Sequence, residues 1–178
     1  RVVKSLLLVM LMTVGAAAAA ETLATISAGP GQLILTQFLA APFPHPSRTH
    51  GHTYKETFFP ADPHYADSTV AIFIPPGYRA GAAADFVIHF HGWRNTVAGT
   101  LTQYDLPEQL VASRRNAILI VPEGPRDAPD SSGGKLEDPE GFKRFMAETL
   151  AVLQQRGVVA SNVAVGNIIL SGHRGGYQ

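Results

Sequence analysis

The 178-residue sequence contains no cysteine, a single tryptophan and no net charge. The absence of cysteine excludes a disulfide framework, a thiolate zinc site and a cysteine nucleophile. Fourteen basic residues balance fourteen acidic ones, so the chain has no sustained positive field to hold nucleic acid, and we expect no nucleic-acid partner. The apolar fraction of 46% is ordinary for a globular protein with one core.

The first twenty residues differ from the rest of the chain. Arg1 and Lys4 flank the start, residues 6–14 are almost wholly apolar, and the alanines of residues 16–20 offer small-residue cleavage sites. We interpret residues 1–20 as a secretory signal peptide, because a spanning helix needs roughly 20 apolar residues. Cleavage would remove two basic residues and no acidic ones, which leaves 12 against 14 and a net charge of −2. We expect a secreted or periplasmic protein that meets a membrane only through this peptide during export; an uncleaved anchor is the alternative.

Residues 21–53 form a lead-in followed by a loop rich in proline and histidine. The lead-in either contributes an edge strand or simply precedes the domain. His45, His50 and His52 in the loop could bind a metal, but no acidic residue lies among them, so a solvated loop is the preferred interpretation.

Apolar patterning predicts five strands in the remaining part, residues 54–178. They are 54–59, 69–74, 86–90, 117–121 and 163–170. The first two should pair antiparallel, because Pro75, Pro76 and Gly77 turn the chain. Strands 86–90 and 117–121 are apolar except for His89, as parallel strands buried on both faces are.

Two helices should connect the three later strands. We expect Asp105 to cap the first, with Glu108 three residues on and Arg114 and Arg115 in the last turn. The second helix should have Asp138 as its cap, Pro139 at its first position and Gly157 after its end. Its apolar stripe comprises Phe142, Phe145, Met146, Thr149, Leu150 and Leu153. The predicted fold is α/β, a mostly parallel sheet with flanking helices and an antiparallel amino-terminal strand pair.

The last predicted strand runs into the glycine frame of a nucleophile elbow. This turn needs small residues two before and two after its centre, and Gly172 and Gly176 meet that demand around Arg174. The backbone N–H of the next residue, Gly175, would form half of an oxyanion hole. His173 beside the centre is expected to pack against the turn.

The other half of the hole is predicted in the loop after strand 86–90. Loops at the carboxyl ends of parallel strands face one crevice, where Gly92 would let the backbone approach a reacting carbonyl and Trp93 would supply its N–H. His91 is interpreted as part of this turn and His89 as a hydrogen-bonded core histidine. The two could instead ligate zinc, but no Asp-His pair follows, and we assign no metal.

With these motifs, residues 54–178 resemble the amino-terminal half of an α/β-hydrolase. "HFHGW" is similar to the strand and oxyanion loop of that superfamily, and "ILSGHRGG" is similar to its "SGHSGG" elbow with one residue changed. The resemblance implies a serine esterase or related acyl hydrolase that uses a Ser, an acid and a His in that order. It implies no cofactor and an ester substrate, small or polymeric, with the acid and the histidine beyond Gln178.

Arg174 departs from this pattern, because a guanidinium stays protonated and cannot attack a carbonyl. Ser171 does not replace it, since Ile169 and His173 stand where the elbow needs small residues. We therefore expect the chain as written to be inactive and its complete, serine-bearing form to be an exported ester hydrolase. Three origins of the arginine stay open: an error or damaged copy of a serine codon, an inactivating change, or a non-catalytic relative that binds an anion through Arg174.

The long segment 122–141 should form a solvated loop and one wall of the substrate site. Its acidic residues on the crevice side are Glu123, Asp127, Asp130, Glu137 and Asp138, in a spacing that matches no calcium loop. Trp93 and Tyr104 could add an aromatic face to the site, although core packing is as good an explanation of Tyr104.

Overall fold

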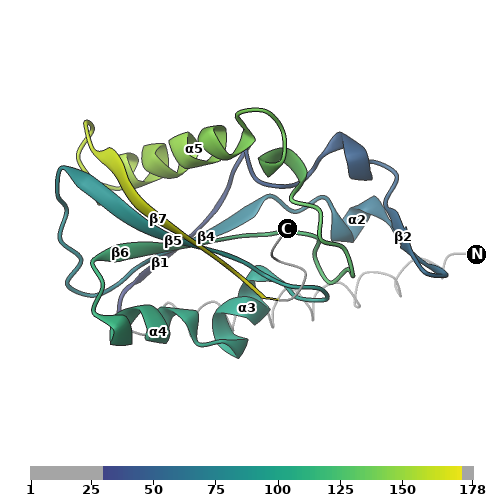
Figure 1. The fold of residues 1–178 in the computed structure, drawn as a ribbon, viewed down its shortest axis with the longest axis horizontal. Coiled ribbons are helices and arrows are strands. Elements are labelled where there is room, and N and C mark those ends of the chain that lie inside the picture. The colour runs from purple at the N-terminus through teal and green to yellow at the C-terminus, as the bar shows by residue number, and fades with distance from the viewer. Residues whose placement is uncertain (1–29, 174–178) are drawn as a thin grey trace, which may run out of the picture.

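A computed structural model describes residues 30–173, in which five strands form one mixed sheet in the order β1-β4-β6-β5-β7 (Figure 1). The strands are β1 (Gln32–Gln37), β4 (Thr69–Ile74), β5 (Ala83–Phe90), β6 (Ala117–Pro122) and β7 (Ala164–Gly172). β1 and β6 flank β4 antiparallel, whereas β6 and β7 flank β5 parallel. The fold is therefore α/β as predicted, but the sheet is mixed rather than mostly parallel.

Four of the predicted strands are confirmed, and the one at residues 54–59 is wrong. That segment contains the turn of a separate hairpin, in which β2 (His52–Tyr54) pairs with β3 (Thr57–Phe59). The two-residue connection has Lys55 at a φ of 54° and contains no glycine or asparagine, so it lacks the usual hairpin signal. The antiparallel partner of β4 is instead β1, from the lead-in.

Helices cover both faces of the sheet, because successive strand residues point to opposite sides. α5 (Gly141–Gln155) packs on one face against Ile72, Phe86, Ile88 and their neighbours. α3 (Val97–Gln103) and α4 (Leu106–Ser113) pack on the other face against Phe73 and Leu119. Figure 1 shows α5 above the sheet and α3 and α4 below it.

Neither of the two aspartates predicted as caps bonds to its helix through its side chain, and only Asp105 stands at the N-cap position. Asp105 precedes α4 with a φ of 47° and makes no side-chain capping bond. α5 begins three residues after Asp138, and Glu140 at its amino end has a φ of 58°. The carboxylate of Asp138 lies 3.3 Å from His45 Nε2 instead. Both helices thus begin after a left-handed residue, Asp105 and Glu140 respectively, and neither makes a side-chain capping bond.

The body of α5 follows the prediction. Phe145, Met146, Thr149 and Leu153 of its apolar stripe are buried, and Gly157 with a φ of 70° follows its end. α3 was not predicted, because the glycine and β-branched residues of its sequence favour helix weakly. Its start is fixed by Thr96, whose hydroxyl accepts the Gly99 N–H at 3.0 Å.

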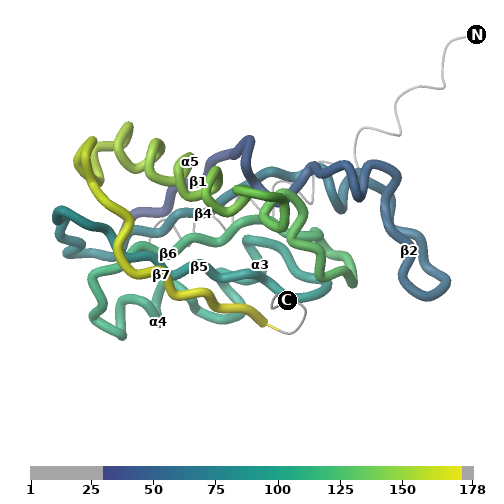
Figure 2. The backbone as a smooth tube through the Cα atoms, turned by 45° about the horizontal axis from the view of Figure 1, so that its top comes forward, coloured from purple at the N-terminus to yellow at the C-terminus, as the bar shows by residue number. Residues whose placement is uncertain are grey.

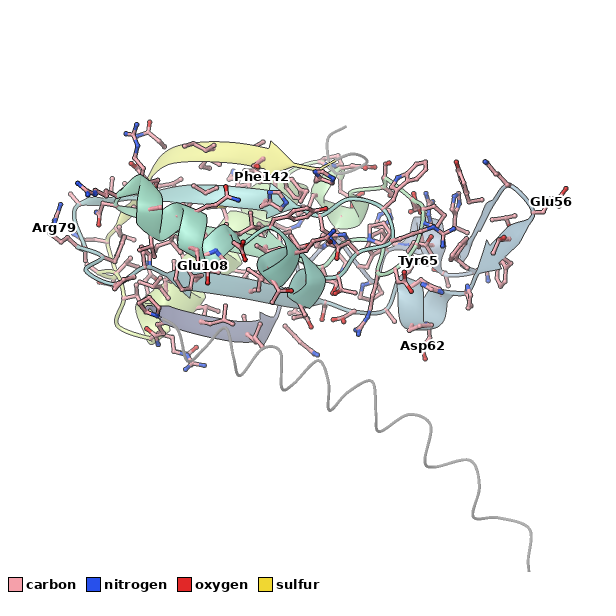
Figure 3. The ribbon with its side chains drawn as sticks, turned by 90° about the horizontal axis from the view of Figure 1, so that it is seen from below. Glu56, Asp62, Tyr65, Arg79, Glu108 and Phe142 are labelled. Carbon is pink, nitrogen blue, oxygen red and sulfur yellow. The ribbon has the colours of Figure 1, made fainter. Side chains whose placement is uncertain are left out.

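The β2–β3 hairpin projects from one end of the molecule (Figure 2), with Glu56 at its tip and Arg79 at the opposite end (Figure 3). Phe43, Phe59, Tyr65 and Ala128 form a small core that joins the lead-in to the loop after β6. Three short helices lie in these connections: η1 (Pro46–Arg48), α2 (Ala61–His64) and η2 (Gly134–Leu136). Among residues 30–173, no helix is both long enough and apolar enough to cross a membrane.

Candidate functional site

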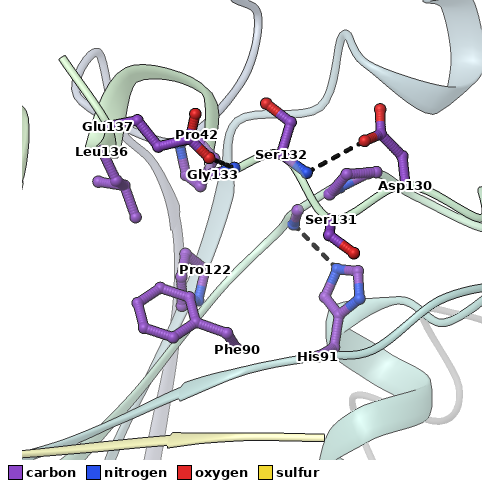
Figure 4. A pocket seen from close by; sticks show the side chains of 12 residues that line it. Pro42, Phe90, His91, Pro122, Asp130, Ser131, Ser132, Gly133, Leu136 and Glu137 are labelled. Atoms are coloured by element: carbon purple, nitrogen blue, oxygen red, sulfur yellow. Dashed lines mark hydrogen bonds between the residues drawn. The ribbon is translucent and has the colours of Figure 1, made fainter. Parts of the chain in front are cut away.

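The carboxyl ends of β5 and β6 define a crevice. These adjacent parallel strands send the chain to opposite faces of the sheet, β5 into α3 and β6 toward α5, which is the arrangement in which α/β sheets bind ligands. A cavity of about 110 Å³ lies there. Figure 4 shows Phe90 and His91 on one side of it and Ser131, Ser132 and Glu137 on the other. The predicted convergence of the loops after β5 and β6 is confirmed.

His91 and Glu123 meet in the protein interior beside this cavity. The two residues are 6% and 3% exposed, and His91 Nε2 lies 2.8 Å from Glu123 Oε1. The second carboxylate oxygen, Oε2, accepts the Val97 N–H at 3.2 Å. Glu123 therefore connects the end of β6 to the loop after β5 and to the start of α3.

The imidazole of His91 is held at both nitrogens. Nδ1 donates to the Gly92 carbonyl at 2.9 Å, and Gly124 N–H points at Nε2 from 2.9 Å. Gly124 permits this approach because a Cβ there would lie 3.2 Å from Nε2. Because Nε2 accepts from Gly124 in this arrangement, Glu123 Oε1 has no hydrogen-bond donor although it lies 2.8 Å from Nε2, and a proton on Nε2 would turn this contact into an ion pair.

Burial and charge act in opposite directions on His91. Burial disfavours the imidazolium and by itself would lower the pKa, but contact with the Glu123 carboxylate and the bond to Gly92 outweigh it and raise the pKa of His91. Once Nε2 carries a proton, it can no longer accept the Gly124 N–H and can donate to Glu123 instead. The proton on His91 therefore decides whether Glu123 or Gly124 is its principal partner.

The loop after β5 is fastened to the loop after β6 by several bonds. The Arg94 N–H donates to the Ala128 carbonyl at 3.1 Å, and the Asp127 N–H donates to the Asn95 carbonyl at 2.9 Å. The indole of Trp93 donates to Ser131 Oγ at 2.8 Å while the residue stays 41% exposed. The segment that carries the predicted oxyanion donor is thus held from both sides.

The end of β7 lies directly beside this loop. Phe90 is paired with Gly172, and the His173 N–H donates to the Phe90 carbonyl at 3.3 Å. The ring of His173 lies 4.8 Å from that of Tyr104, between centroids, as part of a cluster with His89. Arg174, Gly175 and Gly176 lie outside the described residues.

His89 is buried and hydrogen-bonded, as expected of a core histidine. Its Nδ1 lies 3.0 Å from Ser171 Oγ, which ties β5 to β7. Burial lowers the pKa of His89, and the nearby His91 and His173 lower it further. Above its pKa the His89 ring is neutral, so it adds no charge next to the imidazolium of His91.

Sequence reasoning placed Glu123 and Asp130 in a solvated loop, and both are in fact engaged within the protein. Arg48 binds Asp130 with two nitrogens, Nε to Oδ2 at 2.6 Å and Nη2 to Oδ1 at 3.1 Å. Burial opposes ionisation of Asp130, but the bonds from Arg48 and from Ser132 N–H prevail and lower its pKa. The only signal for Glu123 was its position directly after a buried strand, where a side chain still faces the interior.

The metal alternatives gain no support from the geometry. Across residues 30–173 there is no group of three histidine, cysteine or carboxylate side chains placed to hold a metal ion. His45 pairs with Asp138 rather than with its neighbouring histidines. Both nitrogens of His91 and one of His89 already have contacts within the protein.

No protein-family model matches the chain, and no curated protein or solved structure is significantly similar to it.

Proposed function

We propose that the chain belongs to an exported α/β-hydrolase whose complete, serine-bearing form cleaves an ester or a similar acyl bond. The observation that carries the proposal is the contact between the end of β7 and the loop after β5, where His173 N–H meets the Phe90 carbonyl. This contact brings the start of the glycine frame beside the segment that holds Gly92 and Trp93. A nucleophile and two oxyanion donors have to come from neighbouring loops in this way.

In the proposed reaction, a serine at position 174 attacks the acyl carbon and the carbonyl oxygen becomes an oxyanion. The backbone N–H groups of Trp93 and Gly175 would donate to that oxyanion, and loss of one such donor typically lowers kcat by about 10²–10³. The bonds from Arg94 to Ala128 and from Trp93 to Ser131 would hold the first donor in place before substrate arrives. The base that takes the serine proton is expected after Gln178.

Covalent labelling tests this proposal. The Arg174→Ser variant of the full-length protein should form an adduct with a fluorophosphonate probe, whereas the protein with Arg174 and an Arg174→Ala variant should not. A folded Arg174→Ser protein that takes up no probe would argue against the hydrolase. The matched alanine variant controls for reaction of the probe with other hydroxyls.

The alternative is a non-catalytic protein that binds an anion, and the observation that favours it is the arginine itself. A guanidinium next to two backbone N–H groups would bind carboxylate or phosphate. Inorganic phosphate should then bind the protein, and Arg174→Ala should abolish that binding. Equal phosphate binding by the two proteins would exclude this alternative.

The proposed location is outside the cytoplasm, through the signal peptide of residues 1–20. Sequencing the amino terminus of protein recovered after expression with its leader should give Glu21 as the first residue. If the exported protein still carries residues 1–20, this result would point to the membrane-anchored alternative.

A further inference from the structure

A groove beside the crevice is lined by the β2–β3 hairpin on one side and the loop after β6 on the other. It has a volume of about 480 Å³, within the roughly 300–1,000 Å³ of small-molecule sites. Ser131, Ser132, Asp130 and Glu137 line both this groove and the 110 Å³ cavity at the carboxyl ends of β5 and β6. A ligand in the groove would therefore lie next to the site described above.

The groove has one aromatic platform, and its orientation is fixed. The rings of Trp93 and Tyr54 meet edge to face, with centroids 5.1 Å apart and an interplanar angle of 68°. Tyr54 itself packs against the small core around Phe59. Because Ser131 Oγ accepts the indole N–H, the polar edge of Trp93 is satisfied while the residue remains accessible. The Trp93 ring is therefore held in one orientation and remains accessible, so a flat ligand could pack against it.

The remaining lining is polar, and its charged side chains are one arginine and three carboxylates. Arg48 and Asp130 neutralise each other, and His45 faces Asp138 at 3.3 Å. Glu137 is the one further charged side chain in the lining, and it already accepts the Gly133 N–H. With the histidines neutral, the groove has a formal charge of −2, which disfavours anions, while each of the three carboxylates already has a partner within the protein.

This combination selects among ligand classes. An anion would meet Glu137 and Asp138 with the guanidinium of Arg48 already bound to Asp130. An aliphatic chain would require an apolar wall, and the apolar lining consists of two aromatic rings and Pro129. A neutral sugar ring carries no negative charge and needs no continuous apolar wall. Its C–H face packs on the negative face of an aromatic ring, and its hydroxyls bond to carboxylates, imidazoles and serines.

We propose that the groove between Tyr54, Trp93 and residues 129–138 binds a neutral oligosaccharide, with one sugar ring packed on Trp93. This binding does not depend on the hydrolase chemistry. If both proposals hold, the ester that reaches the crevice is carried on a carbohydrate, because the groove and the cavity share one wall.

Calorimetric titration of the full-length protein with cellohexaose, xylohexaose, mannohexaose and chitohexaose tests the proposal. At least one of the four should bind saturably, and it should also change the tryptophan fluorescence of the protein, a change that Trp93→Ala should abolish. Trp93→Ala should weaken that binding by about tenfold or more, since an aromatic contact contributes both its own energy and its buried area. Ser131→Ala keeps the ring but frees its N–H, and should cause a smaller loss.

Phe58→Ala is the matched control, because Phe58 is an aromatic residue of the same hairpin, 59% exposed, that does not line the groove. This variant should bind the sugar like the unaltered protein. Failure of all four sugars to bind, or equal binding by Trp93→Ala in its folded form, would overturn the proposal. Stronger binding of polygalacturonate than of the neutral sugars would also overturn it, because charge would then carry the interaction. Probe labelling at position 174 is scored separately, so the two proposals fail independently.

Discussion

His91 Nε2 lies 2.8 Å from Glu123 Oε1 in the interior, at the point where the loops after two parallel strands meet. The ring and the carboxylate come from positions 32 residues apart in the sequence. Through its other oxygen Glu123 reaches Val97, and through Nδ1 His91 reaches Gly92. This buried pair therefore holds the loop that carries the proposed oxyanion donor in place. The pKa of His91 and the stability that the pair contributes can be measured whether or not position 174 holds a nucleophile.

Replacing Glu123 by glutamine should lower the pKa of His91. The amide has nearly the same shape and its oxygen can still accept the Val97 N–H, but the negative charge that favours the imidazolium is lost. The pKa is read from the pH dependence of the His91 Cε1–H signal in NMR spectra. An unchanged pKa in a folded Glu123→Gln protein would show that the contact with Glu123 does not control the ring.

Removing the carboxylate altogether should be far more costly. Glu123→Ala leaves a buried imidazole without its charged partner and Val97 N–H without its acceptor, and the loss of one member of a buried pair destabilises proteins by about 3–5 kcal/mol. The measurement is the free energy of unfolding in urea. As the control, Lys143→Ala breaks the exposed pair with Glu140, which should change this free energy very little. Similar losses in the two variants would contradict the assigned role of the buried pair.

Stability should pass through a maximum near pH 6.5, because folding shifts the pKa values of two neighbouring histidines in opposite directions. The pKa of His91 is raised in the fold, so the folded state binds more protons than the unfolded state between about 6.5 and that pKa, and stability falls as pH rises through this window. The pKa of His89 is lowered, so below about 6.5 the unfolded state binds more protons, and stability falls as pH drops toward the folded pKa of His89.

The pH profile of unfolding in urea checks both signs. The Glu123→Gln variant should lose the decline above pH 6.5, because His91 then has no raised pKa, and should keep the decline below it. A profile of the unaltered protein that rises steadily from pH 6 to pH 9 would contradict the proposed direction for His91.

A methyl group at position 124 should disturb the His91 ring. The added Cβ of Gly124→Ala would lie 3.2 Å from Nε2 and 3.4 Å from Cε1, which is tighter than an ordinary contact, and overpacking of this kind costs about 1–3 kcal/mol. Gly81→Ala is the matched control, since its Cβ would meet its nearest atom at 3.6 Å. Equal unfolding free energies for the two alanine variants would show that the ring can move aside.

Much of the sheet could be predicted from the sequence, because β4, β5, β6 and β7 are apolar runs that end at glycine, proline or another turn signal. For β1 the sequence left two possibilities, an edge strand or a lead-in, because its ends are polar and several of its residues are half exposed, and its pairing with β4 at the edge of the sheet decides for the strand. The two predicted capping bonds are also absent from the structure. An aspartate before an apolar run normally indicates a cap, but Asp105 and Glu140 have left-handed backbone conformations at the two helix starts, instead of the extended one from which a cap side chain bonds to the first turn.

At the site, the sequence was sufficient to bring the loops together but not to describe their chemistry. Parallel strands have their carboxyl ends at the same edge of a sheet, so the convergence of the loops after β5, β6 and β7 could be predicted, whereas the direct pairing of β7 with β5 could not. The burial of Glu123 and Asp130 depends on partners from distant segments, His91 and Arg48 respectively. The local sequences, Pro122-Glu123-Gly124 and Pro129-Asp130-Ser131, do not indicate these partners.

Breaking the pair of Arg48 and Asp130 should loosen the wall that the 110 Å³ cavity shares with the groove proposed to bind sugar. The two nitrogens of Arg48 hold both carboxylate oxygens, and Asp130 Oδ1 also accepts the Ser132 N–H at 3.1 Å. Asp130→Asn keeps one acceptor but loses the charge. It should lower the free energy of unfolding by about 1.5–3 kcal/mol, the value of a hydrogen bond to a charged group, and accelerate hydrogen exchange at Ser132. Asp138→Asn, in a more exposed position on the same loop, should leave that exchange rate unchanged. Faster exchange in both variants would mean that the loop responds to any lost charge and that Arg48 does not hold it.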